Sequence, residues 1–269
     1  MKKNKIITII FYIISIIFIY FNNPLENNFI SSNNILLLAF SFVMIHVFKC
    51  LRQYFLLIES EVHIKGFVKT YVKTAIPSII LPYKIGELYR AYEYGYHLKD
   101  KVKGLITVIV DKFFDAIILL CVFVPYEYKK SANLSTVTLI LLVFCISLLI
   151  VYTCFNATYY YLNKHFIKKS NANHNIVVLV FLEKSKELYN YVKSMIKDRM
   201  LLLTVLTIFA WSFEWLFVFI LKGSSFIEYI KAVFFGTQNA VFANYMIIGI
   251  ICFILIELIF LVRKCRKKI

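Results

Sequence analysis

The sequence predicts an all-α fold, a polytopic membrane helix bundle of about six full spans plus one or two re-entrant or broken segments. Of the 269 residues, 61% are hydrophobic and 17% are charged, and the mean hydropathy is +0.74. Soluble domains carry about 45–50% apolar and about 25% charged residues, so lipid is expected to be the main solvent of this chain. The spacing of the apolar runs and the distribution of basic residues support the same prediction.

Six apolar runs are long enough, or nearly so, to cross a hydrocarbon core of about 30 Å. They lie near residues 6–21, 35–58, 104–124, 134–155, 200–221 and 243–262. The first run lacks a small-x-small cleavage site, which favours an uncleaved span over a signal peptide. Segments 66–90 and 224–241 are apolar but interrupted by Pro, Gly or charge, so we expect re-entrant or interfacial structure there. No long polar stretch interrupts the chain, which predicts a single integral membrane domain over residues 1–269.

Lysine and arginine are distributed unevenly between the loops that these spans would define. With the N-terminus inside, 26 of the 31 basic residues fall in cytoplasmic segments and 4 in external ones. Basic residues are enriched on the cytoplasmic side of membrane proteins, so both termini are expected in the cytoplasm. The net charge of +16 then reflects orientation and contact with anionic headgroups, and nucleic acid is not an expected partner.

Segment 157–199 is predicted to be an amphipathic cytoplasmic connector. Its apolar residues recur every three to four positions from Ile176 to Met200, among lysines and glutamates. Such a helix lies on or near a membrane surface. Two roles stay open, a link between two helix bundles and the recruitment of anionic lipid.

Charged residues inside the third span are the clearest functional signal. Asp111, Lys112 and Asp115 lie together, and helical rise places Asp115 about 16 Å from Gly104, close to the membrane midplane. Asp111 and Asp115 share one helix face, and Lys112 can partly neutralise Asp115. Charges at this depth normally face protein or a wet cavity. A structural ion pair, a polar lining for a headgroup or ion, and metal-dependent catalysis are the three interpretations.

A second cluster lies in the interrupted segment 66–90. Pro77 and Pro82 each remove a backbone donor, which predicts an irregular turn followed by a short helix that starts near Tyr83. On that helix Glu87 and Arg90 are three residues apart and can pair. The forked guanidinium of Arg90 suits a phosphate. The alternative is a cytoplasmic hairpin with a surface ion pair.

Further polar groups are isolated within apolar runs. Glu214 is expected nearer the outer face, either protonated and hydrogen-bonded or functional. Glu257 is expected to pair with Arg263 or Lys264, and His46 to be packed and hydrogen-bonded. The six cysteines include no Cys-x-x-Cys pair and are expected to act as small hydrophobes, so no metal, cofactor or catalytic residue is predicted.

These motifs resemble the flippase-like integral membrane family typified by the transmembrane region of lysylphosphatidylglycerol synthases. The family pattern Leu-Pro-x-x-x-Gly-Glu-x-x-Arg-Ala matches at residues 81, 82, 86, 87, 90 and 91, and Asp111, Lys112 and Asp115 are conservative equivalents of its next element. Lys49 and Arg52 also fit at the end of the second span. Ser78 stands where the family usually has Asn, and the family's Pro-Gly-Gly element is absent from the last third. The synthases append a soluble aminoacyl-transfer domain, so lysyl transfer by this chain alone is not expected.

The resemblance and the buried charges favour a translocase, or a translocase subunit, for an anionic phospholipid or a polyprenyl-linked glycolipid in the bacterial inner membrane. The expected path residues are Pro82, Lys84, Gly86, Glu87, Arg90, Asp111, Lys112, Asp115 and Glu214. One alternative is a membrane-embedded transferase acting on polyprenyl-phosphate or phospholipid, since Asp-x-x-x-Asp can hold Mg²⁺. Another is a scaffold of envelope assembly. A second copy of the chain and an envelope-synthesis protein are the partners left open.

Overall fold

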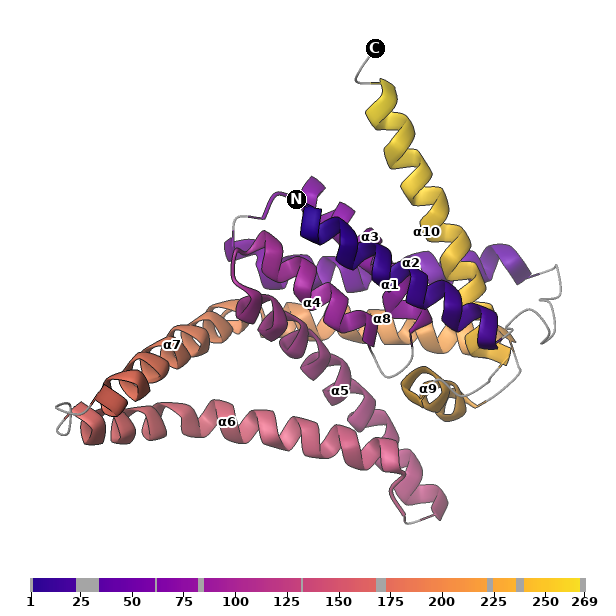
Figure 1. The fold of residues 1–269 in the computed structure, drawn as a ribbon. Coiled ribbons are helices and arrows are strands. Elements are labelled where there is room, and N and C mark those ends of the chain that lie inside the picture. The colour runs from indigo at the N-terminus through magenta and orange to yellow at the C-terminus, as the bar shows by residue number, and fades with distance from the viewer. Residues whose placement is uncertain are drawn as a thin grey trace. The chain divides into compact units, whose positions relative to one another are not determined.

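The computed structural model describes residues 2–22, 34–60, 62–81, 85–131, 133–167, 173–221, 225–235 and 240–266. Among these residues every regular element is a helix, joined by short turns, and none is a strand (Figure 1). The helices are α1 (Lys2–Asn22), α2 (Ile35–Leu57), the short 3-10 helix η3 (Ile58–Ser60), α3 (Ile64–Ile80), α4 (Ile85–His97), α5 (Lys101–Ser131), α6 (Thr136–Ile167), α7 (Asn173–Ile196), α8 (Met200–Leu221), α9 (Phe226–Phe235) and α10 (Ala240–Arg266). The all-α prediction is confirmed for the described residues.

Four helices in the described part of the chain are long and apolar enough to cross a membrane. These spans are Ile35–Ser60, Thr136–Ile167, Met200–Leu221 and Ala240–Ile259. Helix α1 also covers a predicted span, but its apolar part, Ile6–Tyr20, is shorter. Helix α5 covers the predicted span 104–124 and carries three charged residues inside it. Crossing of the membrane by α1 and α5, and the cytoplasmic location of the termini, stay predictions.

The chain divides into two compact units, residues 1–108 with 202–269 (unit 1) and residues 109–201 (unit 2). Within unit 1, α3 is the central helix, because it contacts α1, α2, α4 and α10. It lies side by side with α4 in Figure 1. Ten of its residues are buried, among them Phe67, Tyr71 and Ala75. In unit 2, α6 packs along α7.

The interrupted segment 66–90 is more helical than its sequence predicts. Helix α3 continues through Pro77 to Ile80, and the chain resumes as α4 at Ile85, close to the expected start at Tyr83. The expectation that Pro77 breaks the helix is therefore wrong by about one turn. The physical reason is a side chain from α1 that replaces the donor lost at Pro77, as described below.

The predicted connector 157–199 is divided between two helices. Helix α6 runs past the end of its apolar stretch to Ile167, and α7 covers most of the remainder. No Pro or Gly occurs between residues 134 and 167, so nothing in the sequence terminates α6 at the edge of the apolar run. The amphipathic helix expected from Ile176 onward corresponds to α7.

Segment 224–241 contains a short helix, α9, as its interrupted sequence suggests. Ser225 and Glu228 form a capping box at its N-terminus: the Glu228 amide donates to Ser225 Oγ at 3.3 Å, and the Ser225 amide donates to Glu228 Oε2 at 3.2 Å. Tyr229 and Ile230, on the inner side of α9, are fully buried. Helix α9 contacts α10, so it belongs to the core of unit 1.

Candidate functional site

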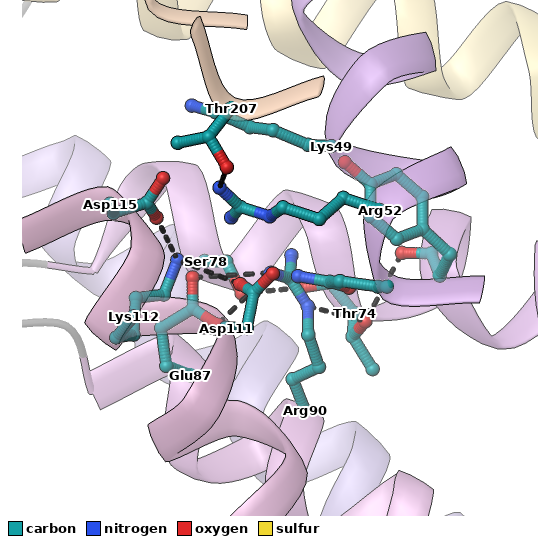
Figure 2. A network of polar contacts seen from close by, with 12 residues as sticks. Lys49, Arg52, Thr74, Ser78, Glu87, Arg90, Asp111, Lys112, Asp115 and Thr207 are labelled. Carbon is teal, nitrogen blue, oxygen red and sulfur yellow. Dashed lines mark hydrogen bonds and ion pairs between the residues drawn. The ribbon is translucent and has the colours of Figure 1, made fainter. Parts of the chain in front are cut away.

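The Arg90 side chain is buried beside the break between α3 and α4. Its Nη1 atom donates to both carboxylate oxygens of Glu87, at 3.0 and 3.2 Å, and its Nε donates to Thr74 Oγ1 at 3.3 Å. The guanidinium carbon also lies 5.2 Å from the ring centre of Tyr71, within cation–π range. Figure 2 shows Arg90 reaching toward Thr74 of α3 from its own helix. The predicted pairing of Glu87 with Arg90 is confirmed, but the pair is buried rather than a surface ion pair.

The lack of a side chain at Gly86 brings the start of α4 against the backbone of α3. A Cβ atom built at Gly86 would lie 2.3 Å from Ser78 Cα and 2.4 Å from the Pro77 carbonyl oxygen. Only glycine permits this approach. The approach places Glu87 and Arg90, on the following turn of α4, beside Thr74. Ser78 donates its hydroxyl to the Thr74 carbonyl at 2.8 Å.

Pro77 leaves one carbonyl of α3 without its helical donor. Proline has no N–H, so the oxygen of Lys73, four residues earlier, loses the usual hydrogen bond. The Tyr12 hydroxyl of α1 donates to that oxygen at 3.0 Å. The same hydroxyl lies 3.4 Å from Glu257 Oε1 on α10. Tyr12 therefore joins α1, α3 and α10 at the proline, and it is a described partner of Glu257 that the sequence interpretation did not predict.

Two further polar contacts of unit 1 join α2 to α8. Lys49 Nζ lies 2.7 Å from Glu214 Oε2, and Tyr229 donates its hydroxyl to Glu214 Oε1 at 3.0 Å. Arg52 Nη1 donates to Thr207 Oγ1 at 2.9 Å, as Figure 2 shows. The later residue of α2 pairs with the earlier residue of α8, so the two helices run antiparallel. The sequence interpretation treated Glu214 and Lys49 separately, and the structure makes them partners.

Helical rise places the Lys49–Glu214 pair well inside both helices. Glu214 is about 21 Å from Met200 at the start of α8, and Lys49 is about 12 Å from Leu57 at the end of α2. The sequence interpretation left a hydrogen-bonded and a functional role open for Glu214, and the structure gives its carboxylate two partners, Lys49 and Tyr229.

His46 is packed and hydrogen-bonded, as expected. Its Nδ1 lies 3.0 Å from the Tyr71 hydroxyl of α3 and its Nε2 lies 3.2 Å from the Tyr245 hydroxyl of α10. The Tyr71 ring also contacts the Arg90 guanidinium, so it connects His46 to the cluster of Tyr71, Thr74, Glu87 and Arg90, here named the Arg90 cluster. With both ring nitrogens engaged by hydroxyls, His46 holds three helices together, and no acyl-transfer role is needed to explain its presence.

Lys73 and Glu93 form another ion pair that the sequence interpretation did not identify. Lys73 Nζ lies 2.9 Å from Glu93 Oε1, which links α3 to α4 one turn beyond the Arg90 cluster. The sequence indicates part of this result, because both residues are charged within an otherwise apolar region and therefore need polar partners. Their pairing depends on the side-by-side packing of α3 with α4, which the sequence pattern alone does not give.

The acidic cluster of α5 belongs to unit 2. Lys112 Nζ lies 3.1 Å from Asp115 Oδ2 and 3.4 Å from Asp111 Oδ2, and both carboxylates are buried. The expected shared face and the partial neutralisation of Asp115 by Lys112 are confirmed. An ammonium group in contact with both carboxylates takes the place in which a dication would otherwise bind, which counts against a magnesium site.

The contacts of the predicted site residues are described within each unit. The structure brings Gly86, Glu87 and Arg90 together against α3, and it places Glu214 in a different ion pair with Lys49. The three α5 residues contact one another within unit 2. Convergence of Arg90 with Asp115 stays a prediction because these residues belong to different units. Pro82 and Lys84 lie outside the described residues.

Comparison of the chain with protein-family models, curated proteins and solved structures finds no match. The resemblance to the flippase-like family consequently stays a prediction that depends on the motif residues. The geometry itself defines the chemistry available. The described contacts of the buried Arg90 guanidinium include the Glu87 carboxylate, the Thr74 hydroxyl and the Tyr71 ring. A carboxylate on a guanidinium can be exchanged for another oxyanion.

Proposed function

We propose that this protein is a lipid translocase, or the membrane subunit of one, which moves an anionic phospholipid or a polyprenyl-linked glycolipid across a bacterial inner membrane. The observation that carries the proposal is the burial of Arg90 at the α3–α4 break, where Glu87 neutralises it. A phosphate binds guanidinium in the same forked manner as a carboxylate. A lipid phosphate could therefore replace Glu87 on Arg90 while Thr74 and Tyr71 keep the guanidinium in place.

The membrane setting explains why such an exchange is useful. A charged headgroup in hydrocarbon needs a polar partner, whereas its acyl or prenyl chains need none. Four described helices are long and apolar enough to hold the protein in the bilayer. The polar groups of α5 supply a second hydrophilic surface, on which Lys112 is shared between two carboxylates. We assign the Arg90 cluster to headgroup capture and the α5 cluster to the lining of the path.

A headgroup-flipping assay in proteoliposomes tests this function. Fluorescent phosphatidylglycerol and a fluorescent polyprenyl phosphate serve as probes, and a membrane-impermeant quencher reports the fraction that has crossed. Arg90→Gln removes the charge-assisted hydrogen bonds and is expected to lower the flipping rate about tenfold. Asp115→Asn is expected to slow flipping as well. Lys65→Gln, on the exposed first turn of α3, is the matched loss of one positive charge and should flip at the wild-type rate.

Two outcomes would contradict the proposal. Equal flipping by wild-type protein, Arg90→Gln and protein-free liposomes would remove the transport function. Magnesium-dependent formation of a new lipid product by the purified protein would favour the alternative transferase. Normal accumulation of each variant in the membrane is checked first, so that a folding defect is not scored as lost transport.

A further inference from the structure

The His46 imidazole of α2 contacts α3 and α10 within unit 1. Its Nδ1 lies 3.0 Å from the Tyr71 hydroxyl, and its Nε2 lies 3.2 Å from the Tyr245 hydroxyl. Phe42 and Phe253 pack against the imidazole, with ring centres 4.5 and 4.9 Å from it. The imidazole is therefore fixed in place, and each of its nitrogens faces one tyrosine hydroxyl.

Tyr245 decides which nitrogen of His46 carries the proton. Its side chain is 5% exposed, and in the described part of the chain the hydrogen-bond partner of its hydroxyl is His46 Nε2. The hydroxyl proton must point at Nε2, because a buried O–H donor without an acceptor is strongly unfavourable. Nε2 can accept only when it carries no proton. The contacts thus assign a neutral imidazole with its proton on Nδ1.

This tautomer makes His46 a hydrogen-bond donor to Tyr71. The Nδ1 proton is donated to the oxygen of the Tyr71 hydroxyl. Tyr71 is 3% exposed, and its ring centre lies 5.2 Å from the guanidinium carbon of Arg90. One tyrosine side chain consequently joins a donor on α2 to a cation on α4. Because the hydrogen bond holds the hydroxyl end, the ring keeps its position beside the guanidinium.

The Tyr71 ring matters most when Glu87 leaves Arg90. The proposed function requires a lipid phosphate to take the place of the Glu87 carboxylate, and the guanidinium has to stay in position during this exchange. Thr74 Oγ1 accepts from Arg90 Nε at 3.3 Å, which is a long hydrogen bond, and the aromatic ring supplies a second contact from α3. A guanidinium that is already fixed loses less conformational entropy on binding a phosphate.

We infer that His46 is a positioning residue of the Arg90 cluster. Its neutral imidazole, protonated at Nδ1, holds the Tyr71 ring beside the Arg90 guanidinium and thereby raises the affinity of this site for a lipid phosphate. His46 acts through Tyr71 and needs no contact with the lipid. The binding of a lipid phosphate to Arg90 rests on the proposed function, whereas the tautomer of His46 and the position of the Tyr71 ring do not.

Asparagine and glutamine at position 46 separate the roles of the two ring nitrogens. The side-chain amide of asparagine is as many bonds from the backbone as Nδ1, and the amide of glutamine reaches the position of Nε2. His46→Asn therefore keeps the donor to Tyr71 and loses the contact with Tyr245, whereas His46→Gln does the reverse. Each variant removes one hydrogen bond between helices, so a merely structural role predicts equal effects of the two substitutions.

NMR spectra of the full chain in lipid nanodiscs test the inference without transport. Isotopically labelled histidine reports which ring nitrogen is protonated, and the signals lost in His46→Gln identify His46. We expect the proton on Nδ1. Labelled arginine reports the Nε–H signal of Arg90, which lies beside the Tyr71 ring and is identified by its loss in Arg90→Gln. This signal should stay at the wild-type position in His46→Asn and move in His46→Gln.

The dependence of the flipping rate on lipid concentration tests the same asymmetry in function. His46→Gln is expected to raise the apparent KM for phosphatidylglycerol about fivefold with kcat unchanged, as the loss of one hydrogen bond would, and His46→Asn should restore the wild-type KM. Tyr71→Phe should raise KM as much as His46→Gln does. Combining Tyr71→Phe with His46→Gln should raise it no further, because both substitutions remove the same hydrogen bond.

A proton on Nε2 of His46, whether alone or together with one on Nδ1, would overturn the inference. Equal movement of the Arg90 signal in His46→Asn and His46→Gln would also overturn it, since His46 would then only hold helices together. The expected NMR spectra combined with no flipping by the wild-type protein would refute the proposed function and support the positioning of Arg90 by His46. The two proposals therefore fail in distinguishable ways.

Discussion

At Pro77, helix α3 lacks one backbone hydrogen-bond donor, and a side chain of α1 supplies a donor in its place. The carbonyl of Lys73 would accept from the amide at position 77 in an uninterrupted helix, and the Tyr12 hydroxyl takes over that role at 3.0 Å. We therefore expect Tyr12→Phe to destabilise the protein by about 1 kcal/mol, the typical cost of a lost hydrogen bond. Thermal unfolding in detergent measures the effect.

A double-mutant cycle isolates this interaction from the other contacts of Tyr12. Pro77→Ala restores the backbone N–H, so the Tyr12 hydroxyl is no longer needed at Lys73, and Tyr12→Phe should cost less in that background by about 0.5 kcal/mol or more. The contact of Tyr12 with Glu257 is present in both backgrounds and cancels. Additive effects of the two substitutions would show that the hydroxyl does not replace the missing donor.

The sequence predicts polar contacts within one helix turn much better than contacts between helices. Glu87 with Arg90 and Lys112 with Asp115 are three residues apart, and a helix brings such residues together whatever surrounds it. Lys49 and Glu214 are 165 positions apart, so their meeting depends on the packing of α2 against α8. Spacing carries no information about that packing.

At the scale of elements, the contact between α3 and α4 depends on Gly86. A methyl group there would meet backbone atoms of Pro77 and Ser78, which cannot move without displacing α3. Gly86→Ala is expected to lower stability by about 1–3 kcal/mol, as overpacking does. Because the displacement also moves Glu87 and Arg90 from Thr74, it should reduce lipid flipping more than stability alone explains.

Gly66→Ala is the control for this substitution. Gly66 lies in α3, and nothing stands within 4 Å of a Cβ atom built on it. Alanine is the better helix former, so Gly66→Ala should stabilise the protein by about 0.5–1 kcal/mol. Equal effects of the two substitutions in thermal unfolding would contradict the close approach of α4 to α3.

The predictions for individual helices differ in quality for a physical reason. Apolar length identifies α2, α8 and the start of α6 closely, because lipid selects for continuous hydrophobicity. It misjudges α3, where Lys73 pairs with Glu93 of α4 and the hydroxyls of Thr74 and Ser78 donate to carbonyls of α3 itself. Polar residues that are satisfied inside a bundle lower the hydropathy without interrupting the helix.

At the scale of the whole molecule, the distribution of basic residues predicts which loops face the cytoplasm. We expect cysteine at Lys184, on exposed α7, to react with a membrane-impermeant maleimide only after the inner membrane is permeabilised. Cysteine at Lys129, in the exposed last turn of α5, should react in cells whose inner membrane is intact. The described native cysteines lie in α2, α5, α6 and α10, and the wild-type protein gives their background.

The labelling pattern also decides whether α6 crosses the membrane. If both positions are labelled from the same side, the stretch between residues 129 and 184 either does not cross the membrane or crosses it an even number of times. That result would contradict the predicted crossing by α6. The antiparallel contacts of α2 with α8 require opposite crossing directions for those two spans, and this agrees with the orientation that the basic residues predict.

The partnership of Lys49 with α8 also constrains how the protein is made. The ribosome delivers α2 to the membrane long before it has synthesised Glu214, and Trp211, the aromatic ring beside the same ammonium, comes equally late. During that interval the nascent chain holds a positive charge in the middle of a hydrophobic segment. We therefore expect α2 to be held less firmly in the membrane until α8 emerges, and a chain truncated before α8 to accumulate at a lower level than the full chain.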